Sequence, residues 1–147
     1  MPLVLNNTGN IPISVGNIEV NATDVHGETD PDTALYAGNF SIGTTTSTLK
    51  PECSQTNMSR FAFVSINNAE LPRGNHSVND GHTGQEQLYY CLRVVGAETS
   101  AQKYSTTQDG LWIIKVISLL GISFRLCFKV KREFCTGFKE LSSFRRT

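Results

Sequence analysis

The sequence predicts an all-β protein, an antiparallel β-sandwich with an irregular or short helical C-terminal tail. Two observations lead to this prediction. Short runs of β-branched and aromatic residues recur along the chain, with turn-forming Gly, Pro, Asn and Thr between them. No segment of the first 110 residues has apolar residues spaced along one helical face over three turns. We therefore expect a β-sandwich domain over residues 1–117 and a basic, apolar tail over residues 118–147.

The expected strands differ in how their apolar residues are arranged. In the second of them, Gly16-Asn17 predicts a tight turn or a bulge. The run at 60–66 is apolar on both faces and is expected at the centre of a sheet, whereas Lys115 points away from the apolar side of the last run. The polar segments 43–59 and 72–87 are expected to be long loops. The six expected strands are 2–5, 11–20, 34–42, 60–66, 88–95 and 111–118.

Charge divides the chain into two unlike parts. Residues 1–110 hold five Lys and Arg against eleven Asp and Glu, a net charge of −6. Residues 111–147 hold eight Lys and Arg against two Glu, a net charge of +6. Nucleic-acid binding by the long part is unfavourable because phosphate contacts need clustered cations. The sign reversal indicates two segments of different origin or task.

The tail leaves three interpretations open. The apolar run at 116–124 is too short to span a bilayer, because it holds only nine residues. It could lie on a membrane surface with Lys129, Lys131 and Arg132 near lipid head groups. Alternatively, the tail completes the sheet and then frays, or it is the product of a shifted reading frame.

The cysteines suggest an oxidising compartment. A Cys53–Cys91 disulfide would close a 38-residue loop, which the chain-entropy model values at about 4 kcal/mol. The alternative is one buried and one exposed free thiol. Cys127 and Cys135 could pair with each other, and they lack the spacing and nearby His of a zinc site.

Asparagine usage indicates a glycosylated surface protein. The N-x-S/T pattern occurs five times where composition predicts about two matches. All five lie in the acidic part of the chain, and the alternative is that turn-forming residues simply cluster. The five candidate sites are Asn6, Asn21, Asn39, Asn57 and Asn75.

Two groups of residues contain side chains that can bind metals, and neither leads us to expect a metal or another cofactor. His76, Asp80 and His82 lie in a Gly- and Asn-rich loop without a candidate second shell. An acidic loop lacks the D-x-D-x-D-G order of calcium loops and is more typical of a solvated turn. We find no G-x-S-x-G, no phosphate-binding Gly-rich loop and no Cys-His frame, so we expect no catalytic residues and no enzyme. The acidic loop holds Asp24, Glu28, Asp30 and Asp32.

Several short motifs resemble immunoglobulin-like repeats of archaeal and bacterial surface proteins, in particular Asn- and Thr-rich secreted proteins of small archaeal genomes. Tyr89 and Cys91 also match the tyrosine-corner spacing of immunoglobulin domains, although Trp112 follows the second cysteine. The resemblance implies an antiparallel immunoglobulin-like β-sandwich, a first hairpin closed by the N-T-G-N turn, and no enzyme activity. It also implies that Met1 is an internal start, so that the chain is a piece of a longer protein. The motifs are residues 3–12 with N-T-G-N, Gly38–Ser41, Leu71–Asn75, Tyr89–Cys91 and Trp112–Val116.

From these features we expect a non-catalytic, extracellular or cell-surface structural or adhesion module. Its expected partners are other surface-protein subunits or glycans, met at the loops 43–59 and 72–87, with weak membrane contact by the tail at most. The alternative function is a subunit of an extracellular filament or viral coat that assembles by β-strand addition.

Overall fold

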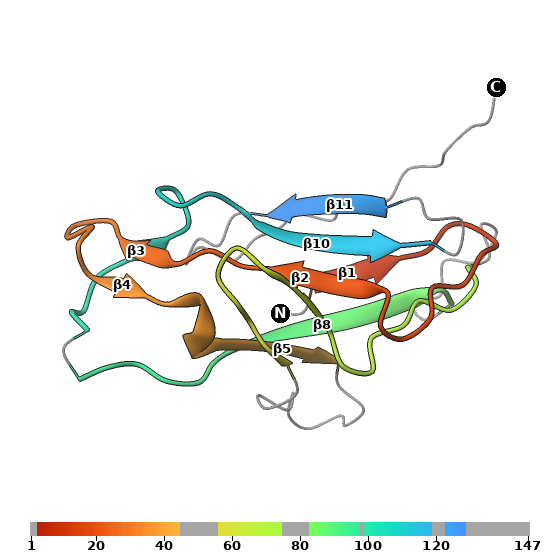
Figure 1. Cartoon of the computed structure of the whole chain (residues 1–147), viewed down its shortest axis with the longest axis horizontal. Coiled ribbons are helices and arrows are strands. Elements are labelled where there is room, and N and C mark those ends of the chain that lie inside the picture. Colours follow the sequence, from red (N-terminus) through yellow and green to blue (C-terminus); the bar gives the residue numbers. More distant parts are fainter. Residues whose placement is uncertain (1–2, 45–55, 75–82, 98, 119–122, 129–147) are drawn as a thin grey trace.

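The computed structural model describes residues 3–44, 56–74, 83–97, 99–118 and, for the backbone alone, 123–128. It is an all-β protein with antiparallel sheets, as the sequence predicts (Figure 1). One 3-10 turn, η1 (Ala37–Asn39), interrupts the strands. Among the described residues, no helix is long and apolar enough to cross a bilayer.

The first sheet has four strands in the order β1-β8-β5-β6. Every neighbouring pair is antiparallel, and β8 lies between β1 and β5, with Leu88 opposite Leu3 and Thr44. Its strands are β1 (Leu3–Asn6), β8 (Gln85–Leu92), β5 (Phe40–Thr44) and β6 (Thr56–Asn57).

The second sheet also has four strands, in the order β11-β10-β2-β7. All pairs are antiparallel, and in the central pair Ile114 lies opposite Val20. The strands are β11 (Ser123–Phe128), β10 (Trp112–Ile117), β2 (Ile18–Asn21) and β7 (Phe63–Ser65).

A small third sheet extends one end of the molecule, at the left of Figure 1. Its order is β4-β3-β9, from β4 (Ala34–Leu35), β3 (Val25–Gly27) and β9 (Tyr104–Ser105). Since β3 follows β2 after only three residues, the chain runs directly from the second sheet into this end.

The core lies between the two larger sheets, and Trp112 is the largest of its fully buried side chains. The predicted alternation of β10 is confirmed, because its buried and half-buried residues alternate and Lys115 faces outward to an ion pair with Glu19 at 2.9 Å. The Trp112 ring contacts Phe40 edge-on, with ring centroids 5.1 Å apart, which joins the two sheets. Its indole N–H donates to the Thr23 carbonyl at 2.9 Å, so the buried polar atom is satisfied.

Two of the expected strands differ from the structure in their place or continuity. The prediction that 60–66 is central is wrong, because β7 is the last described strand of its sheet and Phe61 is exposed. Its apolar residues make contacts at the edge of the sheet instead; Phe63, for example, lies under the Lys115 ammonium group. The run 34–42 is not continuous, because η1 separates β4 from β5.

Two other expected strands differ in extent. Strand β8 starts at Gln85 and ends at Leu92, so it takes up part of the expected loop 72–87 and leaves Val94 exposed. In the run 11–20 only Ile18–Asn21 forms a strand. The turn before it is confirmed by Gly16, which has φ +89°.

The first hairpin implied by the resemblance is not formed. Strand β1 pairs with β8 and belongs to the first sheet, whereas β2 belongs to the second. The segment between them therefore crosses from one sheet to the other, and Ile13 makes an isolated bridge to Leu71 on the way.

Part of the tail completes the second sheet. Strand β11 pairs with β10 along its whole length, from Phe128 opposite Trp112 to Ser123 opposite Ile117. The expected irregular or helical tail is therefore wrong for Ser123–Phe128, and the interpretation that the tail extends the sheet holds there. Residues 119–122 and 129–147, including Lys129, Lys131 and Arg132, lie outside the described residues.

Candidate binding surface

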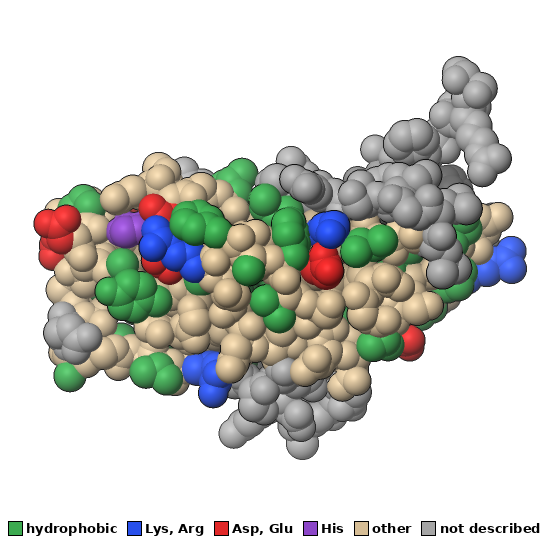
Figure 2. Space-filling view, viewed as in Figure 1, with side chains coloured by type: hydrophobic (Ala, Val, Ile, Leu, Met, Phe, Trp, Pro, Cys, Tyr) green, Lys and Arg blue, Asp and Glu red, His purple; other side chains and the backbone are tan. Residues whose placement is uncertain are grey.

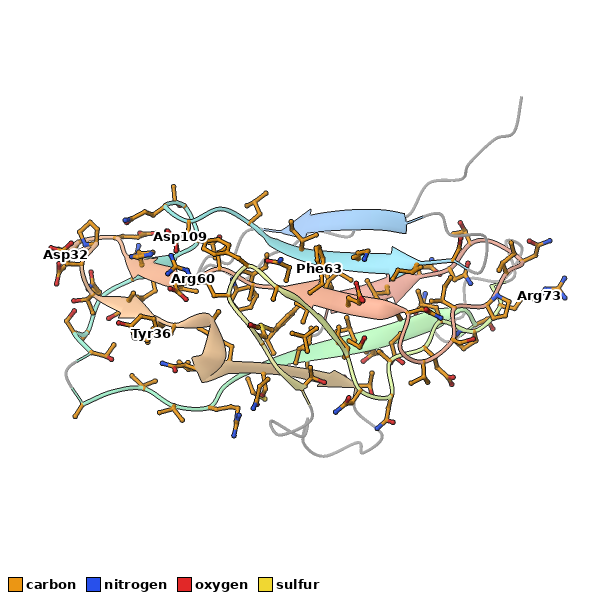
Figure 3. The ribbon with its side chains drawn as sticks, in the orientation of Figure 1. Asp32, Tyr36, Arg60, Phe63, Arg73 and Asp109 are labelled. Carbon is orange, nitrogen blue, oxygen red and sulfur yellow. The ribbon has the colours of Figure 1, made fainter. Side chains whose placement is uncertain are left out.

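Four charged or titratable side chains meet at the end of the molecule that carries the third sheet. We call Asp24, His26, Arg60 and Asp109 the Arg60 cluster. The Arg60 guanidinium donates through Nη2 to Asp109 Oδ2 at 2.9 Å and lies with Nε 3.2 Å from Asp24 Oδ2. His26 Nε2 lies 3.2 Å from the same Asp109 oxygen. Figure 3 shows Arg60 and Asp109 pointing toward each other across this end.

Backbone contacts place each member of the cluster. Asp24 follows β2 and is 4% exposed at its side chain, and its Oδ1 accepts from the Ala37 amide at 2.8 Å. Asp109 lies in a turn closed by a hydrogen bond from the Gly110 amide to the Thr106 carbonyl, where Gly110 has φ +104°. A buried carboxylate needs such partners, because an unpaired one would be strongly destabilising.

Arg60 and Phe61 are held by the backbone of Ala22. Arg60 makes an isolated parallel bridge with Ala22, and the Phe61 amide donates to the Ala22 carbonyl at 3.0 Å. Phe61 has φ +55°, a conformation that is sterically unfavourable for a bulky side chain. Its ring lies under the guanidinium, with Arg60 Cζ 4.7 Å from the ring centroid, and the side chain still is 62% exposed.

The geometry of His26 favours its protonated form. The ring nitrogen Nδ1 lies 2.9 Å from the Pro31 carbonyl, which can only accept, so Nδ1 carries a proton. Because a neutral imidazole carries only one proton, Nε2 can donate to Asp109 only when the ring is protonated on both nitrogens. The Pro31 hydrogen bond raises the pKa of His26 above 6.5, burial opposes this, and the carboxylates of Asp109 and Asp24 raise the pKa further.

The charges of the Arg60 cluster balance when His26 is protonated. Two carboxylates face one guanidinium, and the imidazolium supplies the second positive charge. The cluster is thus a fixed ion network at the surface, with Arg60 51% exposed at its side chain.

Beside the cluster, a pocket of about 370 Å³ opens between β3 and the segment after β9. The residues that line it include an imidazole, a carboxylate, two hydroxyls and an amide. The Ser105 and Thr107 hydroxyls lie 3.0 Å apart and share one hydrogen bond. The lining residues are His26, Gly27, Glu28, Ser105, Thr107 and Gln108.

The structure does not bring the acidic loop together as a calcium site. Asp24 is engaged with Ala37 and Arg60, whereas Asp30 accepts from Asp32 and Thr33 within its own turn. Gln102 fixes this turn by accepting from the Asp30 amide at 2.8 Å. Within the described ranges, no three His, Cys, Asp or Glu side chains are placed to hold a metal ion. The candidate residues His76, Asp80 and His82 lie outside those ranges.

The predicted cysteine pairs stay predictions. Cys91 lies on β8 opposite Ser41 and is 9% exposed. Cys53 and Cys135 lie outside the described residues. Cys127 lies on β11 opposite Ile113, and only its backbone is described.

Four of the five candidate glycosylation sites are described, and none of them is buried. Asn57 on β6 is exposed, and its side-chain carbonyl accepts a hydrogen bond from Arg93. Asn6, Asn21 and Asn39 are half-buried, and Asn75 lies outside the described residues. The tyrosine-corner spacing is not accompanied by the bond typical of that motif, since the Tyr89 hydroxyl donates to the Gln87 side chain at 2.6 Å.

Most of this surface is not apparent from the sequence. Arg60, Phe61 and Asp109 carry no motif, and they come from segments far apart in the chain. The one local signal is the Asp109-Gly110 turn pair before β10.

Comparisons with known proteins give no relative for the chain. No family model, no curated protein and no solved structure matches it.

Proposed function

We propose that the protein is a non-catalytic, extracellular or cell-surface module of structural or adhesive type, built as an immunoglobulin-like sandwich. Support for the sandwich comes from the two four-stranded sheets and the core that they share around Trp112. Such modules act through surfaces that a rigid scaffold positions, which fits the ordered ion network at the Arg60 end.

One observation supports the extracellular setting most directly. Each of the four described N-x-S/T asparagines reaches the surface of the fold, although three of them lie on strands and one in η1. Residues along a strand point alternately into and out of the fold. The access of all four asparagines to the surface therefore does not follow from the turn-rich composition that could create N-x-S/T matches by chance. Glycan attachment requires this access.

Oxidation of Cys53 and Cys91 is the second part of the proposal. Cys91 is nearly buried on a central strand, where a disulfide would fix the segment before β6 to the first sheet. A bond of this loop length contributes about 4 kcal/mol in the chain-entropy model.

Intact mass of the protein secreted from a glycosylating host tests the proposal. We expect a mass above that of the bare polypeptide, a decrease when N-glycans are removed, and a gain of two hydrogens per disulfide on reduction. Asn57→Gln should remove one glycan, whereas Asn67→Gln, an exposed asparagine without the pattern, should remove none. A bare chain with all thiols free would contradict the proposal.

A further inference from the structure

The surface around the Arg60 cluster offers both polar donors and acceptors and flat aromatic rings. We define the Arg60 face as the cluster, the adjoining pocket and the exposed side chains of Tyr36 and Phe61. Figure 2 shows this side of the molecule, with a histidine (purple) beside blue, red and green side chains at the left end. Figure 3 labels Tyr36, Arg60 and Asp109 on the same side.

The pocket and the aromatic residues are connected by a chain of contacts. His26 lines the pocket and lies 3.2 Å from Asp109, which accepts from Arg60 at 2.9 Å, and Arg60 stacks on Phe61. A ligand bound in the pocket can therefore extend over Arg60 to the Phe61 ring and contact charged side chains along the way.

Arg60 is held in place before a ligand arrives. Its Nε and Nη2 are oriented by two carboxylates and its plane by the Phe61 ring. The other terminal nitrogen has no carboxylate partner among the described side chains, although half of the side chain is exposed. Binding through this nitrogen costs little rotamer entropy, because the guanidinium is already ordered.

Two aromatic residues of the Arg60 face are largely exposed. Tyr36 is 63% exposed and Phe61 is 62% exposed. Phe61 also occupies a left-handed conformation, with φ +55°, that glycine would adopt without strain. A strained, exposed phenylalanine beside an ordered arginine is typical of a residue kept for binding.

Charge decides the class of ligand. Glu28 lines the pocket, and the Arg60 cluster is neutral when His26 is protonated, so an anionic ligand would meet a net negative charge there. A cationic ligand would meet the exposed guanidinium. A neutral ligand with many hydroxyls avoids both costs and can use the carboxylate, hydroxyl, amide and guanidinium groups together.

We propose that the Arg60 face binds a neutral saccharide. A sugar ring presents C–H groups on one face, which the electronegative face of the Phe61 ring attracts, and hydroxyls at its rim, which the pocket residues and Arg60 bind. The proposal deepens the adhesive function and rests on it only for the setting in which the sugar is met.

The test uses the full chain, secreted and oxidised, in two-dimensional amide NMR. The probes are neutral tetrasaccharides of glucose, mannose and N-acetylglucosamine, each titrated to millimolar concentration, with a sulfated tetrasaccharide as the charged comparison. We expect at least one neutral probe to shift amides of β3, residues 60–61 and residues 104–110, and the sulfated probe to bind more weakly.

Phe61→Gly separates binding from folding. It should weaken the affinity for the active probe by about tenfold because the stacking ring is lost. It should leave the melting temperature unchanged or raise it, since φ +55° suits glycine. Val15→Ala removes a side chain that is 53% exposed at the other end of the molecule, and it should leave the affinity unchanged.

Three results would overturn the inference: no amide shift with any neutral probe, shifts confined to other surfaces, or an affinity that Phe61→Gly leaves intact. A protein that is glycosylated and oxidised but binds no probe would refute the saccharide site and leave the proposed function standing.

Discussion

The Arg60 end and the opposite end of the molecule are stabilised by different kinds of contact. At the Arg60 end, segments distant in sequence are joined by charged side chains. At the other end, where Arg73 lies in Figure 3, Asn7 joins them through amide hydrogen bonds and close backbone packing. Asn7 donates through its side chain to Ile11 and Pro72, and its own amide donates to Gly84 at 2.7 Å.

The two ends are expected to respond differently to pH and salt. Ion pairs that include a histidine depend on pH and salt, whereas amide hydrogen bonds and glycine contacts do not. At the neutral end a Cβ on Gly74 would lie 1.6 Å from the Asn7 carbonyl oxygen. The contacts of Asn7 are therefore expected to be insensitive to pH and to require glycine at position 74, whereas the ion pairs of the Arg60 end should weaken with salt and with rising pH.

The largest expected effect is that of Trp112→Ala, which removes the anchor between the core and the Arg60 end. We expect the free energy of unfolding to decrease by about 3–5 kcal/mol, because the loss of a large buried side chain leaves a cavity. Denaturant titration of the variant and of Trp112→Phe, which should lose less, provides the measurement. A loss below about 1 kcal/mol would show that Trp112 is not central to the core.

Gly74→Ala should be the next most damaging change, at the Asn7 end. The added methyl group must displace the Asn7 backbone, and we expect a loss of about 2–3 kcal/mol in the free energy of unfolding. Gly38→Ala is the matched control, since a Cβ there meets nothing within 4 Å, and it should be nearly neutral. Equal effects of the two variants in thermal unfolding would refute the close packing at this end.

Arg60→Gln should cost less, about 1–2 kcal/mol, because it leaves the Asp24 and Asp109 carboxylates without their shared cation while the site stays partly open to water. The loss should shrink at high salt. Lys115→Gln removes the Glu19 pair on the sheet surface and should cost about 0.5 kcal/mol. If both substitutions cost the same, the Arg60 network is no more than an ordinary surface pair.

The smallest expected effect is a pH dependence that comes from His26. Its pKa is raised in the folded protein, so its contribution is fully present below pH 6.5 and is lost as the pH rises through the folded-state pKa. The free energy of unfolding should therefore decrease above pH 6.5, and His26→Gln should flatten this decrease. Denaturant titrations from pH 5 to pH 9 compare the two proteins, and parallel curves would remove His26 from the account.

Local patterns in the sequence predicted the elements that depend on a single segment. The alternation of Trp112, Ile114 and Val116 identified β10, and the glycine at 16 identified a turn, because both signals lie within a few residues. The prediction that 60–66 is a central strand was wrong, because a central strand and an edge strand differ in the strands that pair with them. Distant segments of the chain determine this pairing.

The candidate site was even less accessible to sequence reasoning. Asp24, His26, Arg60 and Asp109 come together through sheet topology, and none of them forms a motif with its neighbours in the chain. The acidic loop suggested a calcium site, whereas Asp24 forms an ion pair with an arginine 36 positions later in the chain. Such a cluster becomes visible only when the fold is known.

The central claim is that His26 completes the charge balance of the Arg60 cluster, and the pKa of its ring measured by NMR tests this claim directly. We expect a His26 pKa above 6.5 that falls in Asp109→Asn, whereas Asn7→Ala should leave the pKa of His26 unchanged. A His26 pKa at or below 6.5, or one that does not respond to Asp109→Asn, would contradict it.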